Sequence, residues 1–515
     1  MKQNKVRPLG LLLCTVFLLI RCVPCLANPT LNVGSKRFTE SHILGEILTQ
    51  LAQTQGGVSA EHHAELGNTG IVFQALKSGE IDVYPEYTGT ISQELLKDKS
   101  PVDMATMNAQ LAPLGLSAGV PLGFNDTYAL AMRKDQADKL GIKNISDLVQ
   151  HQNLKFGLSP EFIGRADGWP GVRSAYGLTQ AQPNGVDHGL AYEAIAQGQI
   201  DVMDIYSTDS KISKYNLLVL NDDKHFFPAY DAVLLYRSDL PQRFPAAWAS
   251  FQRLQGTINA ELMVKMNAAA ELDHVEIPEV AKNFIATAIL KEKPDTTLQA
   301  QQPNFLHQLF GGDFWILTVQ HLELTFGSLI VSIIIGIPLG IWCARNTLAA
   351  HFILGLVGLV QTIPSLALLA FLIAIVNRIG FLPAAIALSL YALLPIVRNT
   401  YTGLLDIPKS LRESAQALGL PASARLIQIE LPLAKRSILA GIKTSAVINV
   451  GTATIAALIG AGGYGERIVQ GYTLDDHLIM LSGAIPAAGL ALLVQWAFDG
   501  LETLMVPKAL RQKPS

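Results

Sequence analysis

Apolar residues are distributed unevenly along this chain, and their pattern divides it into two parts. From residue 28 to about residue 300, short apolar runs alternate with polar and charged residues, as in a water-soluble α/β domain. From roughly Phe314 to Met505, long apolar runs dominate and charged residues are confined to short loops. The pattern therefore predicts a soluble domain followed by a membrane domain, and a chain of 515 residues is long enough for both.

Five apolar stretches in the second part are each long enough to cross a hydrocarbon core of about 30 Å as a helix. If residue 300 lies outside, the first span runs inward, and the stretch from Asp406 to Arg436 must be cytoplasmic. The distribution of basic residues favours the same topology. The five predicted spans are approximately 315–343, 352–376, 381–400, 437–460 and 478–500. The basic residues assigned to the cytoplasm are Arg345, Lys409, Arg412, Arg425, Lys435, Arg436, Lys508, Arg511 and Lys513, and those assigned to the outside are Arg378 and Arg467.

The first 27 residues have the three-part layout of a secretory signal. Lys2, Lys5 and Arg7 precede an apolar stretch, and a small residue at Ala27 suits cleavage. An uncleaved N-terminal anchor is the alternative, and in either case the soluble domain faces outward. Because three of the four cysteines lie in this segment, only Cys343 remains in the mature chain, and no intramolecular disulfide is possible there.

A twelve-residue pattern in the soluble part occurs twice, as GEIDVYPEYTGT at residues 79–90 and as GQIDVMDIYSTD at residues 198–209. Each copy follows an amphipathic helix, starts with the Gly that ends it, and continues as a strand and a polar turn that carries Tyr87 or Tyr206. Because ligands of open α/β sheets bind beyond the C-terminal ends of strands, the repeat predicts two facing lobes that each offer a tyrosine to one cleft. Chance recurrence, with both tyrosines in the core, is the alternative. The strands are predicted from Ile81 to Tyr84 and from Ile200 to Met203.

Four further segments add polar residues to the predicted cleft. LNVGSKRFTESHILGEIL reads as a strand that runs into a helix whose start is marked by Thr39 and Glu40, so Ser35, Lys36 and Thr39 lie at a helix N-terminus suited to an anion. KFGLSPEFIGRADGWPG places Arg165 after a strand of the second lobe. The chain is predicted to pass between the lobes in NDTYALAM and FFPAYDAVLLY, which carry Tyr128 and Tyr230.

The strings GSKRFTES, YPEYTGT, NDTYALAM, IYSTDSKI and DDKHFFPAYDA resemble the extracytoplasmic binding proteins for quaternary-ammonium osmoprotectants, the glycine betaine, carnitine and choline family. The resemblance covers most of residues 31–290. It implies an aromatic box formed by Tyr87, Tyr128, Tyr206 and Tyr230. Ring faces suit a trimethylammonium group because this cation cannot donate a strong hydrogen bond, and each good contact contributes roughly 0.5 to 2 kcal/mol.

The same resemblance suggests partners for a carboxylate at the other end of the solute. Lys36, Arg165 and the backbone N–H groups around Ser35 and Thr39 are the candidates, and Thr90 is a further candidate ligand contact. Lys36 departs from the neutral amide of some relatives, and Glu86 adds an acid beside Tyr87. A pocket with both signs of charge suits a zwitterion larger than glycine betaine, such as ergothioneine, which relatives of this type also handle. An ordinary solvated or ion-paired cation is the alternative for Lys36 and Arg165.

The predicted cytoplasmic segment contains ESAQALGLPASARLIQIELP, which resembles the loop by which ABC importer permeases engage their ATPase. Two short helices joined at Gly419 would form a knob that fits a groove of the motor subunit. Ser414 departs conservatively from the family pattern, and a surface helix with chance spacing is the alternative. The residues that match the pattern are Glu413, Ala415, Gly419, Ile429, Leu431 and Pro432.

Other motifs exclude several functions. GAGGYG at residues 460–465 fits a dinucleotide-binding pattern, but it follows a membrane span and no βαβ unit comes after it. The pair Gly-Lys does not occur, so the chain has no Walker A loop; we expect no cofactor in this chain and expect ATP to be used by a partner subunit. His62, His63 and His188 are interpreted as surface residues, and no metal site is predicted. A net charge of −3 argues against a nucleic-acid partner. No nucleophile–base pair stands out, so the sequence does not indicate an enzyme.

The predicted architecture is a two-lobed α/β periplasmic binding protein, type II-like, fused to an all-α permease of about five spans. The predicted domains are residues 1–27 (signal), 28–295 (binding), 296–314 (linker) and 315–505 (permease). The resemblance implies a multi-pass subunit of an ABC importer in the bacterial inner membrane, with the binding domain outside, that pairs as a homodimer and works with a separate ATPase. A ligand-gated channel or a signalling receptor with such a binding domain is the alternative.

Overall fold

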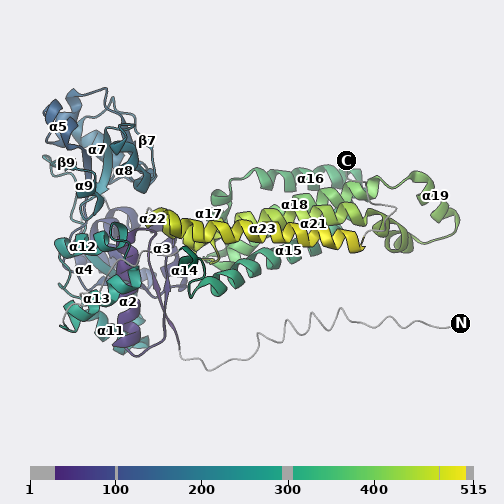
Figure 1. Ribbon diagram of the computed structural model, residues 1–515, viewed down its shortest axis with the longest axis horizontal. Helices are drawn as coiled ribbons and strands as arrows, with labels where there is room; N and C mark the ends of the chain where they lie inside the picture. The colour runs from purple at the N-terminus through teal and green to yellow at the C-terminus, as the bar shows by residue number, and fades with distance from the viewer. Residues whose placement is uncertain (1–28, 99–101, 293–304, 475, 506–515) are drawn as a thin grey trace.

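The computed structural model describes residues 29–98, 102–292, 305–474 and 476–505. Two α/β lobes lie at one end of the molecule, and a long bundle of helices extends away from them (Figure 1). The predicted signal segment lies outside the described residues, as do Lys508, Arg511, Lys513 and much of the predicted linker. The two-part division that the apolar pattern predicts is confirmed by this arrangement.

The first lobe is built on a five-stranded mixed sheet with the strand order β2-β1-β3-β10-β4. The strand β10, which comes from a late segment of the chain, runs antiparallel to the central strand β3. The strands are β1 (Leu31–Gly34), β2 (Ala60–His63), β3 (Val83–Tyr87), β4 (Leu116–Gly119) and β10 (Ala232–Arg237). The helices are α2 (Thr39–Thr54), α3 (Thr69–Ser78), α4 (Met104–Leu111), α10 (Leu240–Arg243), α11 (Pro245–Gln252), α12 (Ala260–Glu271) and α13 (Ile277–Phe284), with the shorter turns η1 (Thr90–Leu95), η2 (Ala112–Leu114) and η4 (Ile285–Ile289).

The second lobe repeats this plan with the strand order β7-β6-β8-β5-β9. Here β5 takes the place of β10 and runs antiparallel to β8. The strands are β5 (Tyr128–Arg133), β6 (Phe156–Leu158), β7 (Asn184–Gly185), β8 (Val202–Tyr206) and β9 (Leu217–Val219). The helices are α5 (Lys134–Leu140), η3 (Ile145–Gln150), α6 (Pro160–Gly164), α7 (Trp169–Tyr176), α8 (His188–Ala196) and α9 (Lys211–Lys214).

The chain passes between the lobes twice, from β4 to β5 and from β9 to β10. The two crossing segments touch at a β-bridge between Asn125 and Asp231. These are the segments that the sequence predicts as crossings, and they carry Tyr128 at the start of β5 and Tyr230 just before β10. The prediction of a two-lobed α/β fold is confirmed.

The two copies of the repeat occupy equivalent places in the two lobes. Gly79 and Gly198 follow α3 and α8 with positive φ angles of 80° and 70°, a conformation that glycine adopts without steric cost. The strands begin two residues later than predicted, so Tyr87 and Tyr206 are the last residues of β3 and β8 and do not lie in the turns. Pairing explains this difference, because the antiparallel partner strands extend the ladder to both tyrosines, opposite Ala232 and Tyr128.

The helical part contains four helices that are long and apolar enough to cross a membrane, or up to five spans if one bent pair counts as a span, among the described residues. The predicted second span is wrong as a single helix, because α16 and α17 meet at an angle of 104°. Ile363 is extended, as expected for a residue before Pro364, and α17 starts anew after that proline. The helices are α14 (Phe305–Leu309), α15 (Phe314–Arg345), α16 (Thr347–Thr362), α17 (Ser365–Val376), α18 (Phe381–Leu405), α19 (Lys409–Ala417), α20 (Ala422–Arg425), η5 (Leu426–Glu430), α21 (Leu431–Ala453), η6 (Thr454–Ile459), α22 (Gly465–Leu474) and α23 (His477–Met505).

The first lobe rests directly on the helical part. A hydrophobic cluster contains Leu66 and Leu76 of this lobe together with Leu372 and Ile459 of the membrane half. The amide Nε2 of Gln74 also donates to Oδ1 of Asn377 at 2.6 Å. The segment around α19 lies at the opposite end of the bundle from both lobes (Figure 1). A bilayer across the bundle therefore separates the lobes from this segment, in agreement with the predicted topology.

Candidate functional site

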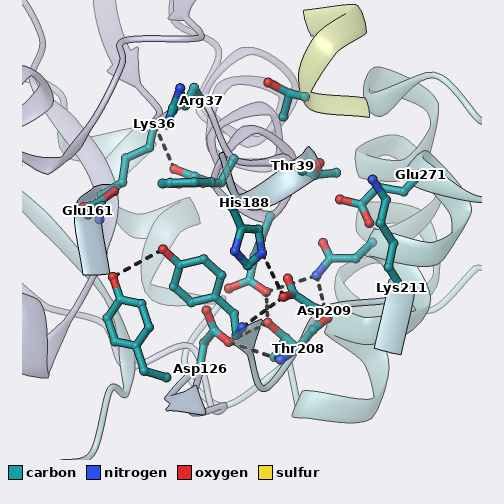
Figure 2. Close-up of a pocket in the computed structure, with 18 of the residues that line it drawn as sticks. Lys36, Arg37, Thr39, Asp126, Glu161, His188, Thr208, Asp209, Lys211 and Glu271 are labelled. Atoms are coloured by element: carbon teal, nitrogen blue, oxygen red, sulfur yellow. Dashed lines mark hydrogen bonds and ion pairs between the residues drawn. The ribbon is translucent and has the colours of Figure 1, made fainter. Parts of the chain in front are cut away.

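A cavity of about 1040 Å³, counting the open space at its mouth, lies between the two lobes (Figure 2). Eight of the ten predicted contact residues are among those that line it. Ser35 and Glu86 are not among its lining residues. The eight that line the cavity are Lys36, Thr39, Tyr87, Thr90, Tyr128, Arg165, Tyr206 and Tyr230.

Three of the four predicted tyrosines form a contiguous aromatic group. The ring centroids of Tyr128 and Tyr206 are 4.9 Å apart, and their hydroxyl oxygens are 3.3 Å apart. Tyr230 meets the Tyr128 ring edge to face at 5.7 Å. Tyr87 lies on the other lobe, and its hydroxyl donates to Glu40. Burial raises the pKa of Tyr87 and of Tyr206, so both phenols are neutral at physiological pH.

Lys36 is buried and paired with an acid. Its Nζ lies 2.6 Å from Oε1 of the fully buried Glu86, and 5.5 Å from the centroid of the Tyr87 ring. Glu86 therefore acts behind the pocket wall, as the counter-ion of Lys36. Ser35 is also turned away from the cavity, because its hydroxyl bonds Nε2 of His62 at 2.8 Å. Neither residue lines the cavity, and the predicted contact of Ser35 and Glu86 with the ligand stays a prediction.

Arg165 is held in the second lobe by a bidentate pair with Asp167, at 2.8 and 2.5 Å. Its guanidinium carbon lies 5.5 Å from the centroid of the Tyr128 ring. One nitrogen also donates to the hydroxyl of Thr90 in the first lobe at 3.4 Å, so Arg165 links the two walls of the cleft. Like Lys36, Arg165 is a buried ion-paired cation, and a solute carboxylate would share it with an acid that is already bound.

Several acids of the pocket were not predicted from the sequence. Thr208 Oγ1 lies 2.5 Å from Glu40 Oε2 and 2.7 Å from Asp126 Oδ1, across the two lobes. A hydroxyl has one proton, so Thr208 cannot donate a full hydrogen bond to both carboxyls. Burial raises the pKa of both acids, and their mutual repulsion raises that of Asp126 further. The string IYSTDSKI contains Thr208, and TES contains Glu40, but only the fold brings them together.

His188 was interpreted as a surface residue, and this interpretation is wrong. It lines the cavity at the start of α8, its ring centroid lies 4.9 Å from that of Tyr206, and its Nε2 lies 3.0 Å from Oδ2 of Asp209. Burial opposes the charged ring, but Asp209 and the neighbouring Asp204 and Asp187 raise its pKa to about 9. The pocket therefore holds an imidazolium at neutral pH, and acids and cations line it together (Figure 2).

His62 is also not a surface residue. Its ring is buried between Ser35 and Glu46, with Nδ1 3.0 Å from Glu46 Oε2, and burial lowers its pKa to about 4. Sequence spacing could not show this, because Glu46 and His62 come from α2 and β2. Among the described residues, no group of three His, Cys, Asp or Glu side chains is arranged to hold a metal ion. The predicted lack of a metal or cofactor stays a prediction.

The residues of the predicted ATPase loop form a helical hairpin at the end of the bundle. Gly419 has a φ of +74° and joins α19 to the segment that leads into α20. Glu413 and Pro432 are exposed, whereas Ala415 is buried within the hairpin. Leu418 and Ile427 are 80% and 65% exposed, which leaves apolar surface on the tip. The hairpin geometry agrees with the predicted knob, while the role of its six matching residues stays a prediction.

Two polar residues of the membrane helix α21 have defined partners. Lys443 of α21 forms an ion pair with Asp499 of α23. The amide of Asn449 donates to Ser328 Oγ at 2.9 Å and links α21 to α15 inside the bundle. Both contacts lie between helices, so these side chains serve the packing of the bundle.

Comparison with known proteins gives matches for both parts of the chain. Residues 29–287 match the model of a family described as the substrate binding domain of ABC-type glycine betaine transport system, and residues 336–508 match that of the binding-protein-dependent transport system inner membrane component.

Three similar proteins come from different bacteria. The carnitine transport permease protein OpuCB of Listeria monocytogenes is 42% identical over 202 residues, which are 39% of this chain and 92% of that protein. The ergothioneine transport permease/ergothioneine binding protein EgtU of Helicobacter pylori (strain G27) is 34% identical over 271 residues, 50% of this chain and 47% of that protein. A glycine-betaine-binding protein of Pseudomonas aeruginosa is 32% identical over 274 residues, 50% of this chain and 87% of that protein.

Proposed function

Because the chain belongs to the family of substrate-binding domains of ABC-type glycine betaine transport systems, fused here to a binding-protein-dependent inner membrane component, we propose that it imports a zwitterionic trimethylammonium compound with the help of a separate ATPase. The chain is an ABC importer subunit of the inner membrane, and it combines the binding and permease functions. The solute, the motor and the assembly are the proposed parts. No finding favours the alternatives of a channel or a signalling receptor.

One observation carries the proposed solute class: the cleft combines the four predicted tyrosines with buried charges of both signs. The group of Tyr128, Tyr206 and Tyr230 offers ring faces to a cation that cannot donate hydrogen bonds. Lys36 and Arg165 border the same cavity and can meet a carboxylate. Similar proteins are named for carnitine, ergothioneine and glycine betaine, and each of these compounds joins a trimethylammonium group to a carboxylate.

The proposed ATPase binds the hairpin of α19 and α20. Its exposed apolar side chains, Leu418 and Ile427, lie at the end of the bundle away from the lobes, where a motor that uses cytoplasmic ATP must bind. ATP is then used by that subunit and not by this chain. A bundle of four or five spans provides one half of a pore, so we expect two copies of the chain to pair in the membrane.

Uptake of labelled solutes tests this proposal. Cells that produce the chain with its ATPase should accumulate at least one of glycine betaine, carnitine and ergothioneine, whereas uptake of choline alone, which has no carboxylate, would contradict the zwitterionic class. Replacing Glu413 by Ala should reduce uptake strongly while leaving solute binding by the purified chain unchanged, because Glu413 is exposed on the hairpin and far from the cleft. Uptake that persists at the normal rate in this variant would contradict the role of the hairpin in coupling.

A further inference from the structure

The helix α22 follows α21 and the turn η6 in sequence, yet its end reaches the cleft between the lobes. Tyr472 and Thr473, near the C-terminus of α22, are among the residues that line the cavity. In Figure 1, α22 lies where the lobes meet the helical bundle, and in Figure 2 a yellow ribbon from the C-terminal part of the chain passes the edge of the pocket. The cavity is therefore bounded by three bodies: two lobes and one segment of the permease.

The contact of α22 with the second lobe is polar. The Tyr472 hydroxyl faces the carboxylate of Asp187, and burial together with this acid raises the pKa of the phenol, which stays protonated. Asp187 caps α8 by accepting from the backbone N–H of Gly189 at 3.0 Å. The carbonyl oxygen of Tyr472 lies 4.0 Å from the position that a Cβ at Gly189 would take, so the backbones of α22 and α8 approach closely.

The contact of α22 with the first lobe is mainly apolar. Leu474 is 6% exposed and belongs to the hydrophobic core of that lobe. Asp476, just beyond the helix, lies 3.5 Å from the ring of His274 after α12. The same Asp476 accepts from the backbone N–H of Leu478 at 2.8 Å and so fixes the start of α23. The end of α22 is thus fastened to both lobes and to a membrane helix.

Beside these contacts, an ion pair links the two lobes directly. Arg37 of the first lobe pairs with Asp187 of the second at 3.4 Å, and the Tyr472 hydroxyl faces the same carboxylate. A segment that holds Asp187 and also anchors in the core of the first lobe favours the arrangement in which both lobes face a common ligand. Asp476 connects this junction to the start of α23.

We propose that Tyr472 and Thr473 form a permease-borne wall of the solute site, so that the affinity of the cleft for its solute depends on the position of α22. This inference rests on the proposed function and extends it, because it makes the binding site a property of the full chain. When α22 stays in place it adds contact area and holds the lobes together around the solute. When the permease rearranges and withdraws α22, the solute loses one wall and the lobes lose one link.

Binding to the full chain in lipid nanodiscs tests this inference. Glycine betaine, carnitine and ergothioneine are titrated separately by calorimetry against the unaltered chain and against Tyr472→Ala, Tyr472→Phe and Tyr128→Ala. Tyr472→Ala should weaken affinity about fivefold or more, and Tyr472→Phe should weaken it less, because the ring that lines the cavity remains and only the hydroxyl is lost. Gln470→Ala is the matched control, since Gln470 lies on α22 but is not among the lining residues, and it should leave affinity unchanged.

Unchanged or tighter binding by Tyr472→Ala, with Tyr128→Ala weakened, would overturn this inference alone. If the unaltered chain bound none of the three compounds, the proposed function would fall and the inference with it. A second measurement does not depend on loss of affinity. In a Cys343→Ser background, saturating solute should slow the labelling of Thr473→Cys by a hydrophilic thiol reagent several-fold. Labelling of Gln470→Cys, the control, should not be slowed. Equal labelling rates of Thr473→Cys with and without solute would overturn the assignment of Thr473 to the pocket wall.

Discussion

At the scale of single residues, Tyr206 offers the sharpest test of the aromatic group. Its ring packs on Tyr128 at 4.9 Å and its hydroxyl makes one long contact of 3.3 Å, so the ring face matters more than the hydroxyl. Tyr206→Ala should weaken solute binding about threefold to thirtyfold, the equivalent of roughly 0.5 to 2 kcal/mol. Tyr206→Phe is the matched control and should change affinity by less than about threefold in the same titration; a similar loss in both variants would show that the hydroxyl, and not the ring, binds the solute.

His188 predicts how stability depends on pH. Its pKa is about 9 in the folded chain against 6.5 in the unfolded chain, so the folded state binds the proton more tightly. This stabilisation is fully present below about pH 6.5 and is lost as the pH rises through 9. The melting temperature of the purified chain should fall over this interval, and His188→Gln should be less stable at pH 6.5 and show a smaller fall. An identical pH profile in both proteins would mean that His188 is neutral in the folded state.

The repeat predicts two tyrosines of the pocket but not its acids. Tyr87 and Tyr206 occupy the same place in both copies, and this symmetry makes them visible in the sequence. The first copy ends in Thr90 and the second in Asp209. This difference between the copies was the one sequence signal that could have pointed to Asp209 as a pocket acid. Glu40 could not be assigned to a pair with Thr208, because the two residues lie in different lobes and meet only when the cleft forms.

At the scale of elements, the turn at Gly419 predicts a defect that separates transport from binding. A side chain here meets no neighbour within 4 Å, so only the φ of +74° opposes it, at a cost of roughly 1 to 2 kcal/mol. Gly419→Ala should therefore lower the uptake rate by reshaping the hairpin, with unchanged solute affinity. Gly451→Ala is the matched control, because it is equally free of neighbours and lies within α21; an equal loss of uptake in both variants would assign the effect to the bundle.

Elements with a long or strongly periodic pattern were predictable, and their ends were not. The apolar runs locate α15, α18, α21 and α23, but hydropathy does not register the break that Pro364 imposes between α16 and α17. The strands β3 and β8 extend further than their apolar residues because their partners continue the ladder. Local sequence thus determines which element forms, while tertiary pairing determines where it stops.

At the scale of the whole molecule, the orientation in the membrane can be tested with single cysteines. Leu418 lies on the hairpin and Val219 on the second lobe, and both are exposed. In spheroplasts that produce a Cys343→Ser background, an impermeant thiol reagent should label Val219→Cys at once and Leu418→Cys only after the membrane is opened. Labelling of Leu418→Cys in intact spheroplasts would reverse the topology and leave the hairpin without access to a cytoplasmic motor.

The docking of the lobes on the bundle could not be predicted from the sequence. Gln74 bonds Asn377, and the backbone of Tyr472 closely approaches Gly189, across separations of hundreds of residues. Neither pair stands in a motif, and nothing in the local pattern around Tyr472 distinguishes it from other loop residues near a membrane surface. The division into two domains follows from composition, whereas their contact follows from surface shape, which the sequence does not display.

The recognition of a permanent cation by tyrosine rings is tested most directly by a solute that keeps the shape and loses the charge. Glycine betaine, choline, carnitine and ergothioneine should be titrated against the full chain together with 3,3-dimethylbutanoate, whose head group is an uncharged isostere of trimethylammonium. We expect at least one trimethylammonium compound to bind and the isostere to bind more than about tenfold more weakly, since the attraction of ring faces requires the positive charge. Equal affinity for the isostere, or no binding of any charged compound, would contradict the account.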